Sequence, residues 1–164
     1  MLKQMLNICG DIGCIAISYG LKNKGCQMSA GRSHEIEIRV RFAETDIYGL
    51  VHHSNFFVWF EMGRIEFLRS IGLTLDDFES EGIYLPIRDA SCCAHSPIKN
   101  DELLIQKTAL AEITPIRIVF NYEVAPKGAK KIAVTGQTTN IFVDSDGKPK
   151  RLSSNLLGKI QQGV

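Results

Sequence analysis

The chain has 164 residues, of which 45% are hydrophobic and 23% charged, a balance typical of a globular protein with a single core. The formal net charge is only +1, which argues against a nucleic-acid-binding surface. The sequence contains no apolar run near the ~18 residues that a membrane-spanning helix needs, so we expect no stable membrane insertion.

The first part of the chain differs in character from the rest. Residues 1–21 are moderately apolar but lack a helical or strand period, and Asp11 interrupts the apolar stretch that a secretory signal would require. Met28 is a candidate initiator just ahead of the first regular strand. We therefore predict a poorly ordered N-terminal extension over residues 1–33 and one domain over residues 34–164.

The five cysteines follow no metal-binding pattern. They include no CxxC pair and no Cys/His spacing typical of zinc, so we predict no metal site. The odd number of thiols, with Cys92 next to Cys93, favours a reducing compartment, and the cytoplasm is the expected location.

The first regular elements are a strand and a long helix. Residues 34–42 alternate between apolar and charged side chains, which predicts a half-buried strand. Its apolar face consists of Ile36, Ile38, Val40 and Phe42. A turn containing Gly49 follows, and a helix is expected from Ser54 to Ser70, ended by Gly72.

The predicted helix changes character along its length. Five bulky residues, Phe56 to Phe60, predict that its first half is buried on nearly every side. Its second half carries charges that can pair at i,i+3, namely Glu61 with Arg64 and Glu66 with Arg69. The first of these pairs is interpreted as a structural ion pair.

The remaining chain reads mainly as strands. A short helix is expected over residues 74–81, four strands over residues 84–95, 102–113, 116–124 and 131–143, and a final short helix over residues 153–161. Turn signals rich in proline, glycine and aspartate separate the strands. The pattern predicts an α+β class, with an antiparallel five-stranded sheet curled around one long central helix.

The segment between the first strand and the helix carries the most informative chemistry. Asp46 lies in the glycine-bearing turn, and His53 follows seven residues later at the expected helix start. A helix N-terminus offers unpaired N–H groups and a partial positive charge. A carboxylate near such a site supplies what the hydrolysis of an activated carbonyl needs, a base or nucleophile and a stabilised oxyanion.

Each of these residues also has a purely structural interpretation. An aspartate shortly before a glycine is commonly a turn former. The two histidines, His52 and His53, fit the polar start of a helix, and Asn55 fits a helix cap as well as it fits a binding site. These alternatives stay open from the residue pattern alone.

The sequence from Arg41 to Arg69, RFAETDIYGLVHHSNFFVWFEMGRIEFLR, is followed by GL, DELLI and FVDSDGKPKRL. Together these motifs resemble the hotdog-fold acyl-CoA thioesterases of the 4-hydroxybenzoyl-CoA thioesterase family. The YbgC-like branch is the most similar, and the resemblance runs from about residue 34 to about residue 155. It implies the hotdog fold for this chain.

The resemblance also implies roles for individual residues. Asp46 matches the catalytic carboxylate, which acts as nucleophile or as general base for water. His53 matches the residue whose backbone N–H holds the thioester oxygen, and in the YbgC-like branch its side chain also belongs to the active site. We expect Asn55 and Gly49 to position the substrate. One departure is Phe42, where that branch often has tyrosine.

The implied activity is hydrolysis of an acyl-CoA to a free carboxylic acid and CoA. No cofactor is expected, because coenzyme A is part of the substrate, and an acyl carrier protein is a second carrier to consider. A homodimer or homotetramer is the expected assembly. Two alternatives remain: a hotdog dehydratase or hydratase, disfavoured because HHSNFF lacks a proline or glycine after the histidine, and a non-catalytic acyl-CoA-binding protein.

Overall fold

The computed structural model describes residues 14–17 and 32–162, and its framework is an antiparallel sheet. The strands lie in the order β1-β3-β6-β5-β4-β2. Their bounds are Cys14–Ile17 (β1), Ser33–Arg39 (β2), Ile87–Ala94 (β3), Leu103–Thr114 (β4), Arg117–Pro126 (β5) and Val134–Ile141 (β6). All neighbouring strands are antiparallel.

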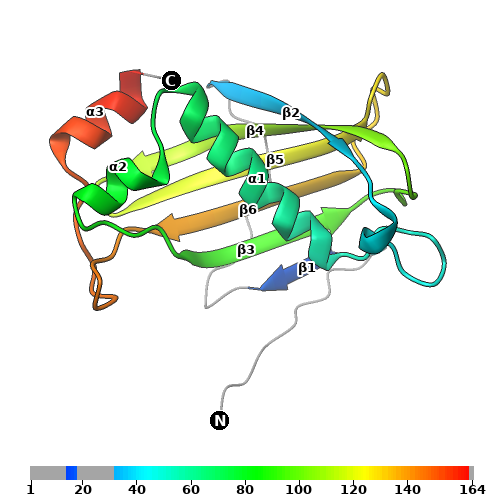
Figure 1. The fold of residues 1–164 in the computed structure, drawn as a ribbon, viewed down its shortest axis with the longest axis horizontal. Coiled ribbons are helices and arrows are strands. Elements are labelled where there is room, and N and C mark those ends of the chain that lie inside the picture. The colour runs from blue at the N-terminus through cyan, green and yellow to red at the C-terminus, as the bar shows by residue number, and fades with distance from the viewer. Residues whose placement is uncertain (1–13, 18–31, 163–164) are drawn as a thin grey trace, which may run out of the picture.

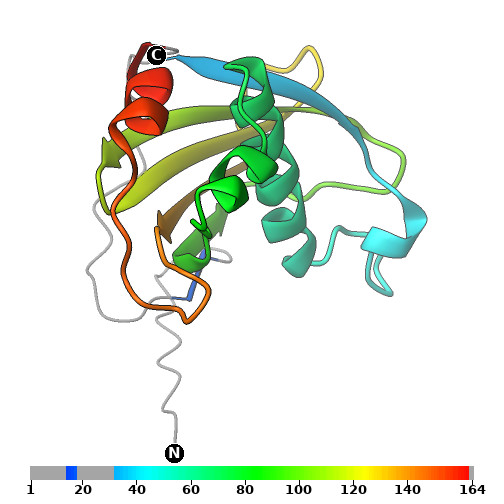
Figure 2. The ribbon, with the colours of Figure 1, turned by 60° about the vertical axis from the view of Figure 1, so that its left-hand side comes forward.

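In the described residues, three α-helices and one 3-10 helix accompany the sheet. The long helix α1 (Ser54–Ser70) lies across one face of the sheet (Figure 1), and the sheet curves around it (Figure 2). The 3-10 helix η1 (Phe42–Glu44) precedes α1, α2 (Leu75–Ser80) follows it, and α3 (Ser154–Gln162) ends the described chain. The predicted α+β class, with a sheet curled around a central helix, is confirmed.

The sheet contains one strand more than the five predicted. β1 pairs with β3 from Cys14 opposite Cys93 to Ile17 opposite Ala90, within a segment for which the sequence showed no strand period. The other residues predicted as a poorly ordered extension, 1–13 and 18–31, lie outside the described residues. The five strands of the predicted domain agree with the structure to within a few residues.

The first predicted strand ends earlier than its alternation suggested. Ile38 and Val40 are buried as expected, but Phe42 is 79% exposed. The reason is a capping arrangement in which the Glu44 carboxylate accepts hydrogen bonds from the backbone and the guanidinium of Arg41. This arrangement turns the chain into η1 and points Phe42 away from the core.

Helix α1 packs closely on the sheet along one side only. A Cβ atom on Gly63 would lie 2.0 Å from Nε2 of Gln106, so the absent side chain permits the close approach. Phe60 stacks on Tyr122 of β5 with ring centroids 4.3 Å apart. On the opposite side Val58 is 47% exposed, so the prediction that the first half is buried on nearly every side is wrong.

The two predicted ion pairs of α1 have different outcomes. Arg69 and Glu66 form the predicted i,i+3 pair. Glu61 and Arg64 form no ion pair in the described part of the chain, and Arg64 instead donates a hydrogen bond from Nη1 to the Tyr122 hydroxyl at 3.5 Å. The structural ion pair expected for Glu61 and Arg64 is therefore a wrong prediction.

Candidate active site

The segment between η1 and α1 is a closed loop that carries Asp46. Thr45 and Val51 form an antiparallel bridge at its base. Within the loop, the Asp46 N–H donates to the Leu50 carbonyl at 2.8 Å, and the Gly49 N–H donates to the Asp46 carbonyl at 3.0 Å. The backbone of the loop is therefore fixed by its own hydrogen bonds.

The Asp46 side chain is exposed and only partly engaged. Its Oδ1 accepts hydrogen bonds from the N–H groups of Tyr48 at 2.8 Å and Leu50 at 3.2 Å. These bonds are those of an aspartate that forms a turn. The other oxygen, Oδ2, has no hydrogen-bond partner in residues 32–162 of the described chain. One carboxylate oxygen thus holds the loop, and the other is available for chemistry.

Gly49 has a conformational reason to be glycine. Its φ angle is +71°, in the left-handed region that residues with a Cβ avoid. A Cβ atom there would meet nothing within 4 Å, so the requirement comes from backbone strain and not from space. The structure thus explains Gly49 as a turn residue, and its predicted part in substrate positioning stays a prediction.

His53 stands at the start of α1 as the N-cap residue, but its side chain makes no capping hydrogen bond. The neighbouring N–H of Asn55 donates to the His52 carbonyl, and that of Phe56 donates to the His53 carbonyl. The backbone N–H of His53 itself finds no acceptor among the described residues. It is an open donor at the positive end of the helix.

The two adjacent histidine rings influence each other. The ring centroids of His52 and His53 are 4.1 Å apart. His53 is largely exposed, but partial burial of its ring lowers its pKa below the ordinary value, and the nearby His52 ring lowers it further. Both causes disfavour the imidazolium form, so the neutral form of His53 predominates at neutral pH. The His52 ring is held by a 2.8 Å contact between its Nδ1 and the Ser54 hydroxyl.

Asn55 acts as a brace and not as a helix cap. Its side-chain Nδ2 donates to the Glu44 carbonyl at 2.8 Å and to the His52 carbonyl at 3.2 Å. An N-cap side chain accepts from backbone N–H groups instead, so the cap interpretation of Asn55 is wrong. The amide ties the start of α1 to η1.

Glu44 is a residue of this region whose role was not predicted from the sequence. It is 4% exposed, and its carboxylate accepts hydrogen bonds from Arg41 and, at 3.1 Å, from the Trp59 indole. Burial alone would raise the pKa of Glu44, but these hydrogen bonds outweigh it and hold the pKa below its ordinary value. The signal available in the sequence was Trp59, because a buried indole N–H requires an acceptor.

The main chain of Glu44 also connects the loop to the helix. Its carbonyl accepts from the His52 N–H at 2.9 Å as well as from Asn55. One buried residue therefore links η1, the base of the Asp46 loop and the start of α1. This connection fixes the carboxylate loop relative to the open N–H of His53.

Two further observations concern other kinds of function. In residues 14–17 and 32–162, no three His, Cys, Asp or Glu side chains gather as metal ligands. Within the same ranges, no helix is both long and apolar enough to cross a membrane.

Comparison with known proteins places the chain in a family. Residues 40–160 match the model of the thioesterase-like superfamily. This range includes the Asp46 loop and all of α1. The chain belongs to the thioesterase-like superfamily. The predictions of a hotdog-fold thioesterase family and of a thioester hydrolase are thereby confirmed.

Proteins similar to this chain are named as thioesterases or thioester hydrolases. The chain is 29% identical to the putative acyl-CoA thioesterase YneP of Bacillus subtilis, over 67% of this chain and 79% of that protein. It is 21% identical to the acyl-CoA thioester hydrolase YbgC of Escherichia coli, over 76% and 93%. Among solved structures, a DHNA-CoA thioesterase from Staphylococcus aureus is 31% identical, with a TM-score of 0.72 over 80% and 87% of the two chains.

Proposed function

We propose that this thioesterase hydrolyses acyl-CoA thioesters to a free carboxylic acid and CoA, with Asp46 as the catalytic carboxylate. The observation that carries the proposal is that two groups, an Asp46 oxygen available for chemistry and the open N–H of His53, lie on two segments that Glu44 joins. The relatives named for acyl-CoA hydrolysis support coenzyme A as the carrier.

In this mechanism the His53 N–H and the Asp46 carboxylate have separate roles. The thioester carbonyl oxygen accepts a hydrogen bond from the His53 N–H, where the start of α1 stabilises the negative charge that develops. As a general base, Asp46 removes a proton from the water that attacks the carbonyl carbon, and this proton passes to the sulfur of CoA as the C–S bond breaks. As a nucleophile, Asp46 attacks the carbonyl carbon itself, the CoA thiolate leaves, and water then hydrolyses the acyl–Asp46 anhydride, which releases the carboxylic acid and regenerates Asp46. Gly49 and Asn55 keep the carboxylate and the donor in place.

The assembly and location follow from the same proposal. We expect a homodimer or homotetramer, because Asp46, His53 and the outer face of α1 are all exposed in a single chain, and a partner subunit would exclude water from them. Coenzyme A is preferred over acyl carrier protein as the carrier, and the cytoplasm is the expected compartment.

A thiol-release assay with purified protein and a series of acyl-CoAs tests this function. We expect release of free CoA together with the carboxylic acid. An enoyl product from a 3-hydroxyacyl-CoA would instead indicate a dehydratase. A rise in melting temperature on adding acyl-CoA, without thiol release, would indicate a non-catalytic binding protein. Either of these two results contradicts the proposal.

A further inference from the structure

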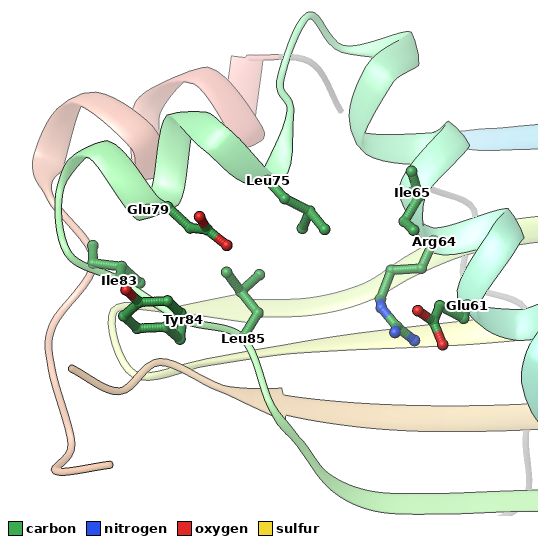
Figure 3. Close-up of a pocket in the computed structure, with 8 residues that line it drawn as sticks. All are labelled: Glu61, Arg64, Ile65, Leu75, Glu79, Ile83, Tyr84 and Leu85. Atoms are coloured by element: carbon green, nitrogen blue, oxygen red, sulfur yellow. The ribbon is translucent and has the colours of Figure 1, made fainter. Parts of the chain in front are cut away.

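A cavity lies farther along α1 than the helix start at His53. It is a cavity of about 180 Å³ between α1, α2 and the segment that leads into β3. Figure 3 shows its lining, to which Arg64 and Ile65 contribute from α1, Leu75 and Glu79 from α2, and Leu85 from the segment before β3. We call it the α1–α2 pocket. Pockets that bury a whole ligand measure about 300–1,000 Å³, so this one is sized for part of a ligand.

The α1–α2 pocket combines apolar side chains with an arginine, Arg64, that uses few of its hydrogen-bond donors. Arg64 is half-buried, and its one hydrogen bond in the described chain is the 3.5 Å contact with Tyr122. A guanidinium has five N–H donors, so most of them face the pocket or solvent. Glu61 and Glu79 also line the pocket, but neither forms an ion pair with Arg64 in the part of the chain that the structure describes.

One face of α1 connects this pocket to the helix start. Phe57, Val58, Glu61, Arg64 and Ile65 follow one another at helical spacing, so they share a face. The pocket begins eight residues beyond His53 and extends to the twelfth, which is about 12–18 Å along a helix that rises 1.5 Å per residue. Val58, at 47% exposure, is the apolar surface between the two places.

From this arrangement, and resting on the proposed function, we propose that the α1–α2 pocket binds the far end of a medium-length acyl chain and selects for a hydroxyl group there. The thioester lies at His53, and the chain runs along Phe57 and Val58. With C–C bonds of about 1.5 Å, an extended chain advances ~1.3 Å per carbon. A chain of about ten to fourteen carbons therefore reaches the pocket.

The charges of the pocket decide which end group it prefers. Its lining holds two carboxylates, Glu61 and Glu79, and one guanidinium, Arg64. A terminal carboxylate would add a third negative charge and be repelled. A hydroxyl group is neutral, accepts a hydrogen bond from Arg64 and donates one to a glutamate. Arg64 is thus a specificity-determining residue of the proposed thioesterase.

The test compares kcat/KM for butyryl-CoA, dodecanoyl-CoA and ω-hydroxydodecanoyl-CoA. The wild-type protein is expected to prefer the hydroxylated chain over dodecanoyl-CoA by about tenfold or more, since tenfold corresponds to the lower end of what one hydrogen bond to a charged group contributes. Arg64→Met should abolish that preference and leave butyryl-CoA hydrolysis unchanged, because a four-carbon chain ends before the pocket. Arg69→Met, on the same helix but paired with Glu66, is the matched control and should keep the preference.

A second variant guards against a folding defect in Arg64→Met. Leu75 is 42% exposed, so Leu75→Trp fills the pocket without disturbing the core and should slow both twelve-carbon substrates by about tenfold or more, but not butyryl-CoA. Equal loss on all three substrates, or a wild-type protein indifferent to the hydroxyl group, overturns the pocket assignment alone. Failure to hydrolyse any of the three overturns the assignment, and failure to hydrolyse every acyl-CoA of the series, aromatic ones included, overturns the proposed function as well.

Discussion

Replacement of Glu44 by glutamine tests whether this buried carboxylate holds the candidate site together. Glutamine keeps the size of the side chain but turns one carboxylate oxygen into an N–H donor. In the wild-type protein, Oε1 of Glu44 accepts hydrogen bonds from the Arg41 guanidinium at 2.7 Å and from the Trp59 indole at 3.1 Å, and Oε2 accepts one from the Arg41 backbone N–H at 2.9 Å. In either orientation of the amide, one N–H group faces another N–H group.

The expected loss follows from these contacts. A hydrogen bond to a charged group contributes about 1.5–3 kcal/mol, and at least one is lost in Glu44→Gln. The Arg41 side chain is 69% exposed, so it regains water and its ion pair adds little. We therefore expect the free energy of unfolding to fall by about 2–3 kcal/mol. Turnover should fall as well, because the Glu44 carbonyl positions His52 and Asn55.

The effect should depend on pH in a defined direction. The folded structure lowers the pKa of Glu44 below the ordinary value of 4.5. Its stabilisation is therefore complete above that value and is lost as the pH falls through the folded-state pKa. The stability difference between wild type and variant should shrink in acid.

Urea unfolding at neutral and acid pH measures both quantities. Glu66→Gln is the matched control, because it removes a carboxylate from an exposed ion pair with Arg69 and should cost under about 0.5 kcal/mol. Glu44 does not hold the candidate site together if Glu44→Gln costs no more than this control, or if the stability deficit of the variant grows as the pH falls.

Three further predictions concern the site and its support. Gly63→Ala should lower the free energy of unfolding by about 1–3 kcal/mol, because its Cβ would meet Gln106. Gly158→Ala, in open space on α3, should instead raise the free energy of unfolding by up to about 1 kcal/mol, and chemical denaturation compares the two variants. Gly49→Ala should strain the Asp46 loop by about 1–2 kcal/mol, because the φ angle of Gly49 is +71°, and this strain should lower kcat. An unchanged kcat would contradict the proposed link between the loop and catalysis. An NMR titration should find the His53 pKa below 6.5, and His52→Gln should raise it partway, because burial is the larger cause; no rise would contradict the assigned role of His52.

Much of the fold was accessible from the sequence because the signals were local. Alternation along β6 and the apolar run of α1, ended by Gly72, predicted these elements with bounds close to those observed. Phe42 was predicted wrongly because its environment depends on a capping interaction between Arg41 and Glu44, which overrides the alternation of the strand. β1 was missed because its pairing with β3 involves residues nearly eighty positions away.

In the candidate site, too, some residues could be predicted from local sequence and others could not. Asp46 and His53 could be singled out from their spacing and from the resemblance. The role of Glu44 could not, because it depends on a buried contact with Trp59 that is fifteen residues distant. The open face around Val58 was also missed, since a uniformly apolar helix does not reveal which side meets the sheet.

In the proposed mechanism, Asp46 performs the chemistry and is not merely a turn former. Asp46→Asn separates the two roles, because the asparagine Oδ1 can still accept the hydrogen bonds from Tyr48 and Leu50. We expect an unchanged melting temperature and a fall in acyl-CoA turnover of about 10²-fold or more. A variant that melts like the wild type and hydrolyses acyl-CoA at the same rate would contradict the proposed mechanism.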